Sequence, residues 1–157
     1  MSASPHRIAQ VTLDEKTVIR RKGDVEHERA VAIADLLEQN SFVPKSGAAG
    51  PFNLHLGIAE ERLVLDVRDD ADKPLERFTL SLAPFRGLVK DYFLVCESYF
   101  SAVKTADPSR IEAIDMGRRS LHNEGSQLLL DKLADEVEID FNTARRLFTL
   151  LCVLHIR

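Results

Sequence analysis

The stretch PFRGLVKDYFLVCESYFSAVKT, from Pro84 to Thr105, is the most apolar helical pattern in the chain. One set of its apolar side chains recurs at steps of three and four, as on one stripe of an α-helix: Phe85, Leu88, Tyr92, Cys96, Tyr99 and Val103. A second set widens that stripe over the middle turns: Val89, Phe93, Leu94, Val95 and Phe100. A helix that is apolar over most of its circumference needs cover on more than one side. The pattern therefore predicts a central helix, packed against both a sheet and other helices.

Length and composition indicate one globular domain spanning residues 1–157. A chain of 157 residues with 45% apolar residues can bury a sizeable core. Few Gly and Pro interrupt it, so we expect disorder only at residues 1–6. Residues 44–51, PKSGAAGP, have loop composition and predict a flexible loop.

Several classes of protein are disfavoured by the same composition. The start MSASPHRIAQ lacks the apolar core of a signal peptide, and no window is apolar enough to span a membrane, which favours a cytoplasmic protein. A net charge of −4 argues against a general nucleic-acid binder, whose affinity comes from neutralising phosphates. Cys96 and Cys152 lie in apolar helical patterns and are expected to be buried free thiols.

Strand and helix patterns place the chain in the α+β class. Ile8–Leu13 alternates as a half-buried strand does, and three further alternating runs predict an antiparallel meander: 54–58, 63–67 and 78–82. Helices are expected from Asp24 to Asn40, from Pro108 to Leu133 with Asp107 as its cap, and after Asp140 or Asn142. We therefore expect an antiparallel sheet of three to four strands with about four helices on one side, the two most apolar helices innermost.

The most concentrated polar chemistry lies in the second long helix, between Asp115 and Ser126. At 100° per residue, Asp115, Arg118, Arg119 and Ser126 fall within about 60° of His122, at the edge of the apolar stripe. An imidazole flanked by guanidinium groups could bind an anion, or have its pKa lowered towards that of a neutral base or nucleophile. The candidates for anion binding are Arg118, Arg119, Asn123 and Ser126, and those for catalysis are His122 and Glu124.

A purely structural interpretation of the same segment competes with the functional one. Asp115 would pair with Arg118 or Arg119 one turn away, and His122 would complete a packing layer. Gly117 and Gly125 weaken a helix, and so suggest close approach of another backbone, a kink or a ligand.

Arg145 and Arg146 begin the last helix, and if that end lies near His122, four arginines would form one anion site. No histidine outside this segment has a partner at a recognised zinc-ligand spacing, so no metal site is predicted. Asp69, Asp70 and Asp72 lack the pattern of a calcium loop. No nucleotide-binding fingerprint or catalytic serine motif is present, so no cofactor is expected.

Two family resemblances rest on longer stretches of residues. Arg119-Ser120-Leu121-His122-Asn123, followed by Gln127-Leu128, is similar to the phosphoacceptor helix of histidine-kinase dimerisation domains, which would make His122 a phosphoryl acceptor. Asn123 stands where that family has an acid, and no ATP-binding motif accompanies the match, so the resemblance would imply a phosphotransfer partner only. Five long runs, among them DVEHERAVAIADLLE and IEAIDMGRRSLHNEGS, closely resemble the bacterial Uncharacterised Protein Family 0262. That resemblance implies a small cytoplasmic bacterial protein with no established activity, and transfers no catalytic residue.

The sequence favours a non-catalytic interaction or regulatory module, because no complete catalytic constellation is present. Two nearly all-apolar helices in so small a chain predict a homodimer, and an unknown protein or a small anionic ligand is the expected partner. The alternative is an anion-binding enzyme or a histidine phosphotransfer protein that uses the face formed by Arg118, Arg119 and His122. A concave pocket at that face would favour the enzyme or phosphotransfer protein, whereas a face lying flat against solvent or another chain would favour the interaction module.

Overall fold

The computed structural model describes residues 6–14, 23–105 and 107–155. Its elements follow in the order β1 (Ile8–Leu13), α1 (Gly23–Glu38), β2 (Phe42–Pro44), β3 (Phe52–Ala59), β4 (Arg62–Arg68), β5 (Pro74–Ser81), the short 3₁₀ helix η1 (Ala83–Phe85), α2 (Arg86–Thr105), α3 (Pro108–Leu133), β6 (Val137–Ile139) and α4 (Phe141–His155). Of the segment expected to be disordered, residues 1–5 lie outside this description. The carbonyl oxygen of His6 accepts a hydrogen bond from the backbone N–H of Phe42 at 3.0 Å.

The main sheet has the strand order β1-β3-β4-β5, and its last three strands form the predicted antiparallel meander. The expectation of a wholly antiparallel sheet is wrong in one respect, because β1 pairs in parallel with β3. The chain leaves β1, forms α1 and returns, so that β1 and β3 run in the same direction, as in any crossover through a helix. A second, two-stranded sheet joins β2 to β6. The α+β class is confirmed, with a mixed sheet.

The loop that precedes β3 is tied to the rest of the chain at its start. Pro44 closes β2, and the N–H of Lys45 donates to the carbonyl oxygen of Glu136 at 2.9 Å. A turn follows, in which the N–H of Gly47 donates to Pro44 at 3.1 Å. The flexibility expected for residues 44–51 remains a prediction.

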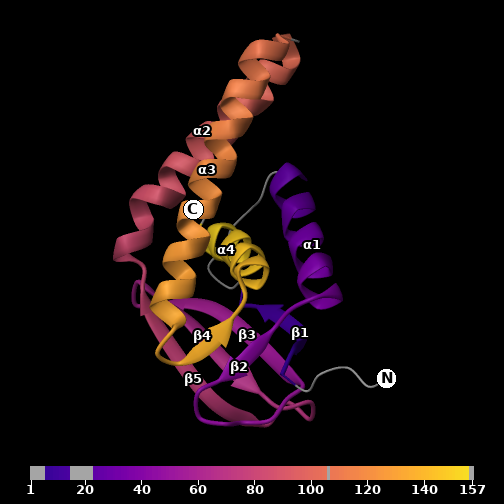
Figure 1. Cartoon of the computed structure of the whole chain (residues 1–157), viewed down its shortest axis with the longest axis vertical. Helices are drawn as coiled ribbons and strands as arrows, with labels where there is room; N and C mark the ends of the chain where they lie inside the picture. The colour runs from indigo at the N-terminus through magenta and orange to yellow at the C-terminus, as the bar shows by residue number, and fades with distance from the viewer. Residues whose placement is uncertain (1–5, 15–22, 106, 156–157) are drawn as a thin grey trace.

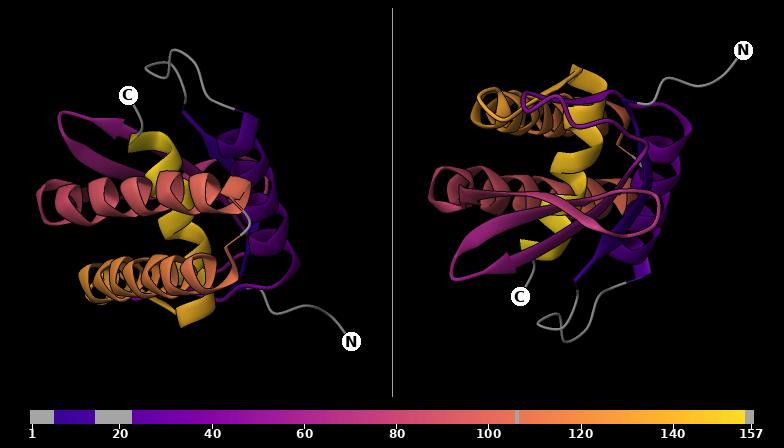
Figure 2. Two further views of the ribbon diagram at one scale, coloured as in Figure 1. Left: turned by 90° about the horizontal axis from the view of Figure 1, so that it is seen from above. Right: turned by 90° about the horizontal axis from the view of Figure 1, so that it is seen from below.

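The central helix is α4, and not the helix that the apolar stripe around Tyr92 predicted. α4 contacts α1, α3 and β3. Its buried apolar side chains are Ala144, Leu147, Phe148, Leu150, Leu151, Cys152, Val153 and Leu154. Asp140 begins it as predicted, since its carboxylate accepts a hydrogen bond from the N–H of Thr143 at 2.8 Å. Figures 1 and 2 show α4 passing beneath the paired helices α2 and α3, with α1 on its other side and the sheet below. Burial of nearly every residue from Leu147 to Leu154 explains why this part of α4 is apolar nearly all round.

Helix α2 is covered mainly on one side, by α3, with which it forms a helical hairpin that extends away from the sheet (Figure 1). Its buried residues are Val89, Tyr92, Cys96 and Ala102, whereas Leu94, Phe100 and Val103 are 41–52% exposed. The prediction that α2 is enclosed by a sheet and several helices is therefore wrong. Of the two helices on which the predicted homodimer rested, α4 is buried within the subunit and α2 is partly exposed. The homodimer stays a prediction.

The long helices α3 and α4 cross in contact at Gly125, which is buried. A Cβ atom added to Gly125 would lie 2.2 Å from Cζ of Phe148, so a side chain at this position would overlap the aromatic ring. The sequence suggested close approach of another backbone, a kink or a ligand at Gly125, and what lies there is the side chain of Phe148. Gly117, on the same helix, has nothing within 4 Å of an added Cβ, and no close packing explains it.

A Gly125→Ala variant should lower the free energy of unfolding by about 2 kcal/mol, because overpacking a close-packed core typically costs 1–3 kcal/mol. Gly117→Ala is the matched control, since the same substitution in open space should raise stability by up to about 1 kcal/mol through helix propensity. Urea unfolding of both variants measures the difference. Adding Phe148→Leu to the Gly125 variant should restore part of the loss. Equal effects at the two glycines would contradict the close packing of α3 on α4.

Candidate functional site

A cleft of about 350 Å³ lies between α1 and the crossing of α3 and α4. α3 supplies Arg118, Arg119 and His122 to it, and α4 supplies Arg145, Arg146 and Thr149. The face singled out in the sequence is therefore concave. The second pair of arginines also lies beside the first, which the sequence could not establish, because the two pairs are brought together only by the crossing of α3 over α4.

Arg118 and Arg119 are held by one carboxylate. Asp115 accepts from Nε of Arg118 at 3.1 Å with one oxygen and from Nε of Arg119 at 2.9 Å with the other. Hydrogen bonds from Arg118 and then from Arg119 lower the pKa of Asp115, so the carboxylate stays ionised. The guanidinium carbon of Arg118 also lies 4.9 Å from the centre of the Tyr99 ring, a cation–π contact. The predicted pairing within α3 is present, and it fixes the two cations at the edge of the cleft.

Arg145 differs from the other three arginines. Its Nε atom is buried and has no hydrogen-bond partner among the residues that the structure describes. Nε of Arg146, by contrast, lies 3.7 Å from Oδ2 of Asp35 on α1. A buried donor without a partner costs free energy, commonly about 1–3 kcal/mol and more for a charged group. Because this nitrogen is closed to solvent, it is not itself a contact for a molecule in the cleft.

His122 lies at the base of the cleft, with its ring against two aromatic rings. The ring centres of Tyr92 and Phe148 are 5.4 and 5.2 Å from that of the imidazole. Nε2 lies 2.8 Å from the hydroxyl oxygen of Thr149, and that oxygen lies 3.2 Å from the carbonyl oxygen of Arg145. The single proton of the Thr149 hydroxyl can be donated to this carbonyl or to Nε2, so the tautomer of the ring decides which of the two groups donates.

The remaining nitrogen of His122 faces Ser126. The Ser126 hydroxyl lies 3.4 Å from Nδ1, but it donates its proton to the carbonyl oxygen of His122 at 2.7 Å. Burial above all, and then the positive charges of Arg145, Arg118 and Arg146, together lower the pKa of His122 to about 4. The imidazole is therefore neutral at physiological pH.

The other candidates from the sequence lie in different surroundings. Ser126 is fully buried and contacts His122, so it supports the imidazole and does not line the cleft. Asn123 and Glu124 are exposed on α3, and neither lines the cleft. The wall opposite the arginines comes from α1, whose Glu28 and Asp35 had no recognisable motif in the sequence. Their spacing of seven residues, two helical turns, was the only available signal that they share a face.

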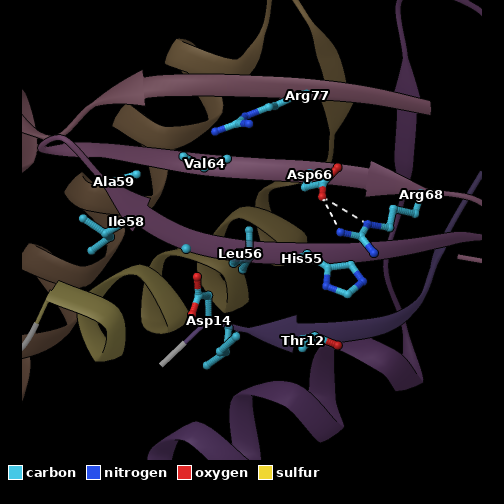
Figure 3. Close-up of a pocket in the computed structure, with 12 residues that line it drawn as sticks. Thr12, Asp14, His55, Leu56, Ile58, Ala59, Val64, Asp66, Arg68 and Arg77 are labelled. Atoms are coloured by element: carbon cyan, nitrogen blue, oxygen red, sulfur yellow. Dashed lines mark hydrogen bonds and ion pairs between the residues drawn. The ribbon is translucent and has the colours of Figure 1, made fainter. Parts of the chain in front are cut away.

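A second, wider cavity of about 650 Å³ lies over the outer face of the main sheet. Figure 3 shows Arg77 reaching over Val64 from β5, with Asp14 on the opposite side, next to β1. Two charged side chains of this cavity pair with each other, since Arg68 donates to Asp66 through Nε and Nη2 at 3.0 and 2.8 Å.

The same network continues to the imidazole of β3. Nη1 of Arg68 binds Asp72 at 2.9 Å, and Asp72 lies 2.9 Å from Nε2 of His55. These hydrogen bonds, from His55 first and then Arg68, lower the pKa of Asp72. No buried polar group of this cavity lacks a partner in the described part of the chain. The helical cleft is therefore the stronger candidate for a binding site.

Residues 6–14, 23–105 and 107–155 contain neither a metal-binding cluster nor a membrane-spanning helix. No group of three or more His, Cys, Asp or Glu side chains there could hold a metal ion. No helix among these residues is long and apolar enough to cross a membrane. Cys96 and Cys152 are buried and form no disulfide bond, as predicted, and burial raises the pKa of Cys152 well above its ordinary value.

The lowered pKa of His122 predicts a specific dependence of stability on pH. The unfolded chain takes up a proton near pH 6.5 but the folded protein only near pH 4, so stability is complete above about pH 6.5 and falls as the pH falls towards 4. Between pH 7 and pH 4.5 this group should cost roughly 2 kcal/mol. Urea unfolding at both pH values should show this loss in the native protein but not in His122→Gln. His55→Gln, which removes a surface imidazole, should keep it. Equal losses in all three proteins would show that His122 is not held neutral.

Comparison with known proteins identifies the family of the chain. Residues 5–157 match the model of Uncharacterised protein family UPF0262. A UPF0262 protein of Azorhizobium caulinodans is 58% identical over 153 residues, 96% of this chain and 94% of that protein. One of Rhodospirillum rubrum is 60% identical over 150 residues, 96% of this chain and 92% of that protein. One of Paramagnetospirillum magneticum is 55% identical over 155 residues, 98% of this chain and 99% of that protein. No solved structure matches significantly. With a family match over nearly its whole length and bacterial relatives of this similarity, the chain belongs to family UPF0262.

Proposed function

We propose that this protein is a non-catalytic regulatory module that binds a small anionic ligand, bearing a phosphate or a carboxylate, in the cleft between α1, α3 and α4. The observation that carries the proposal is the gathering of four guanidinium groups at one small cleft, those of Arg118, Arg119, Arg145 and Arg146. An oxyanion in the cleft would accept hydrogen bonds from these groups and offset their charge.

Guanidinium groups suit this task for reasons of geometry and charge. Their planar N–H donors match the oxygens of phosphate and carboxylate groups, and they remain charged at any physiological pH. Arg118 and Arg119 are already oriented by Asp115, so less side-chain entropy is lost when a ligand binds. The partial burial of Arg118 raises the strength of its charge interactions above their value in water.

The surroundings of His122 favour binding over catalysis. A phosphoacceptor or a general base needs a ring nitrogen within reach of the reacting group. Nε2 of His122 is engaged by Thr149, and Nδ1 faces the buried hydroxyl of Ser126. Glu124 is exposed and lies outside the cleft, so the acid proposed as the partner of His122 is not positioned to assist it. These contacts support a non-catalytic module over the alternative of an enzyme or a phosphotransfer protein.

Titration with inorganic phosphate, followed by amide NMR, tests the proposal. The native protein should show saturable shifts at residues around Arg145, His122 and Thr149. Arg145→Gln should weaken binding about tenfold or more, because a hydrogen bond to a charged group is worth about 1.5–3 kcal/mol. Arg77→Gln is the control, since it removes an exposed guanidinium from the cavity over the sheet. Loss of binding in the Arg77 variant alone would transfer the site to the sheet, and no saturable shift at the cleft would refute the proposal.

A further inference from the structure

The two walls of the cleft carry opposite charge. Arg118 and Arg119 on α3 and Arg145 and Arg146 on α4 form the cationic wall. Glu28 and Asp35, two turns apart on one face of α1, form the other. A simple anion would be attracted by the first wall and repelled by the second. The arrangement therefore suits a ligand with charges of both signs at its two ends.

The net charge of the cleft indicates what the ligand as a whole should carry. Four guanidinium groups are opposed by three carboxylates, those of Glu28, Asp35 and the Asp115 that holds two of the arginines. With the histidines left out of the count, one positive charge remains. A phosphomonoester dianion that also bears one ammonium group has a net charge of −1 and would neutralise the site. An ordinary amino acid, with no net charge, would leave it positive.

Part of the lining of the cleft is apolar. Val31 of α1 lines it and is 43% exposed, and Ala32 and Tyr92 line it as well. A short aliphatic segment of a ligand would cover this surface. The volume of about 350 Å³ is near the lower end of the range of ~300–1,000 Å³ for small-molecule sites, so it suits a small metabolite.

We infer that the ligand is a phosphomonoester of a short amino alcohol. Its phosphate lies on the arginines of α3 and α4, its carbon chain lies over Val31, and its ammonium group faces Glu28 and Asp35 of α1. This inference rests on the proposed function and adds the requirement for the amine.

Matched pairs of ligands separate the two claims. Isothermal titration calorimetry would compare 2-aminoethyl, 3-aminopropyl and 4-aminobutyl phosphate with ethyl, propyl and butyl phosphate, and with inorganic phosphate. For at least one chain length the amine should raise affinity about tenfold, as expected of a charge-assisted hydrogen bond. Glu28→Gln should remove most of that preference and should not weaken the binding of the simple alkyl phosphate. Glu38→Gln, the same change of charge at the end of α1 and outside the cleft, should keep the preference.

The outcomes distinguish the amine requirement from the anion site. If every amine-bearing ester binds no more tightly than its alkyl counterpart, the inference is wrong while the anion site stands. The same conclusion follows if the preference survives in Glu28→Gln. If neither series nor inorganic phosphate binds, the proposed function itself fails. A preference present in the native protein and in Glu38→Gln, and lost in Glu28→Gln, supports both.

Discussion

The contact of Gly125 with the ring of Phe148 determines both the packing of the helical layer and the shape of the cleft. Because Gly125 has no side chain, α3 can lie directly on α4 at this crossing. The same Phe148 ring, on its way through the core, contacts the imidazole of His122. The Phe148 side chain thus contacts both Gly125, where α3 lies on α4, and His122 at the base of the cleft. The position of His122 is set by core packing, which is stiffer than a surface loop.

The crossing also explains how four arginines come to share one small volume. Each pair is adjacent in sequence, one in the middle of α3 and one at the start of α4, and only the geometry of the crossing brings the pairs together. Charges of one sign this close destabilise a folded protein unless they are compensated. Asp115 compensates two of them and Asp35 lies near a third. The fourth, Arg145, retains a buried donor without a partner in the part of the chain that the structure describes.

The local parts of this structure were predictable from sequence, and the parts that depend on long-range packing were not. The alternation around Leu54, Leu65 and Phe78 gave the meander, and Asp107 and Asp140 gave the helix starts, because these patterns depend on neighbouring residues. The pairing of Asp115 with the arginines one turn away is local in the same sense. The parallel pairing of β1 with β3 depends on where α1 returns the chain, which no local pattern records.

The error about the central helix has a physical cause. Apolar residues spread around a helix indicate burial, but they do not say whether the cover comes from the same subunit. α4 and α2 are both apolar, yet α4 lies between α1, α3 and the sheet, whereas α2 contacts mainly α3. The acidic wall of the cleft was missed for a similar reason. Glu28 and Asp35 belong to an ordinary amphipathic helix, and their role follows only from its position opposite Arg145 and Arg146.

Hydrogen bonds through Thr149 connect the imidazole of α3 to the backbone of Arg145 on α4. Nε2 of His122 lies 2.8 Å from the Thr149 hydroxyl oxygen, which lies 3.2 Å from the backbone carbonyl oxygen of Arg145. A cationic residue in place of His122 would add a fifth positive charge, an anionic one would attract the arginines away from a ligand, and an apolar one would leave Thr149 without its side-chain partner. A neutral imidazole avoids these effects, since it is polar enough to fix Thr149 and carries no charge beside the guanidinium groups. Burial and the arginines themselves keep it neutral. The arginines of the cleft therefore help to keep His122 neutral, and His122 in turn contacts the Thr149 side chain beside the backbone of Arg145.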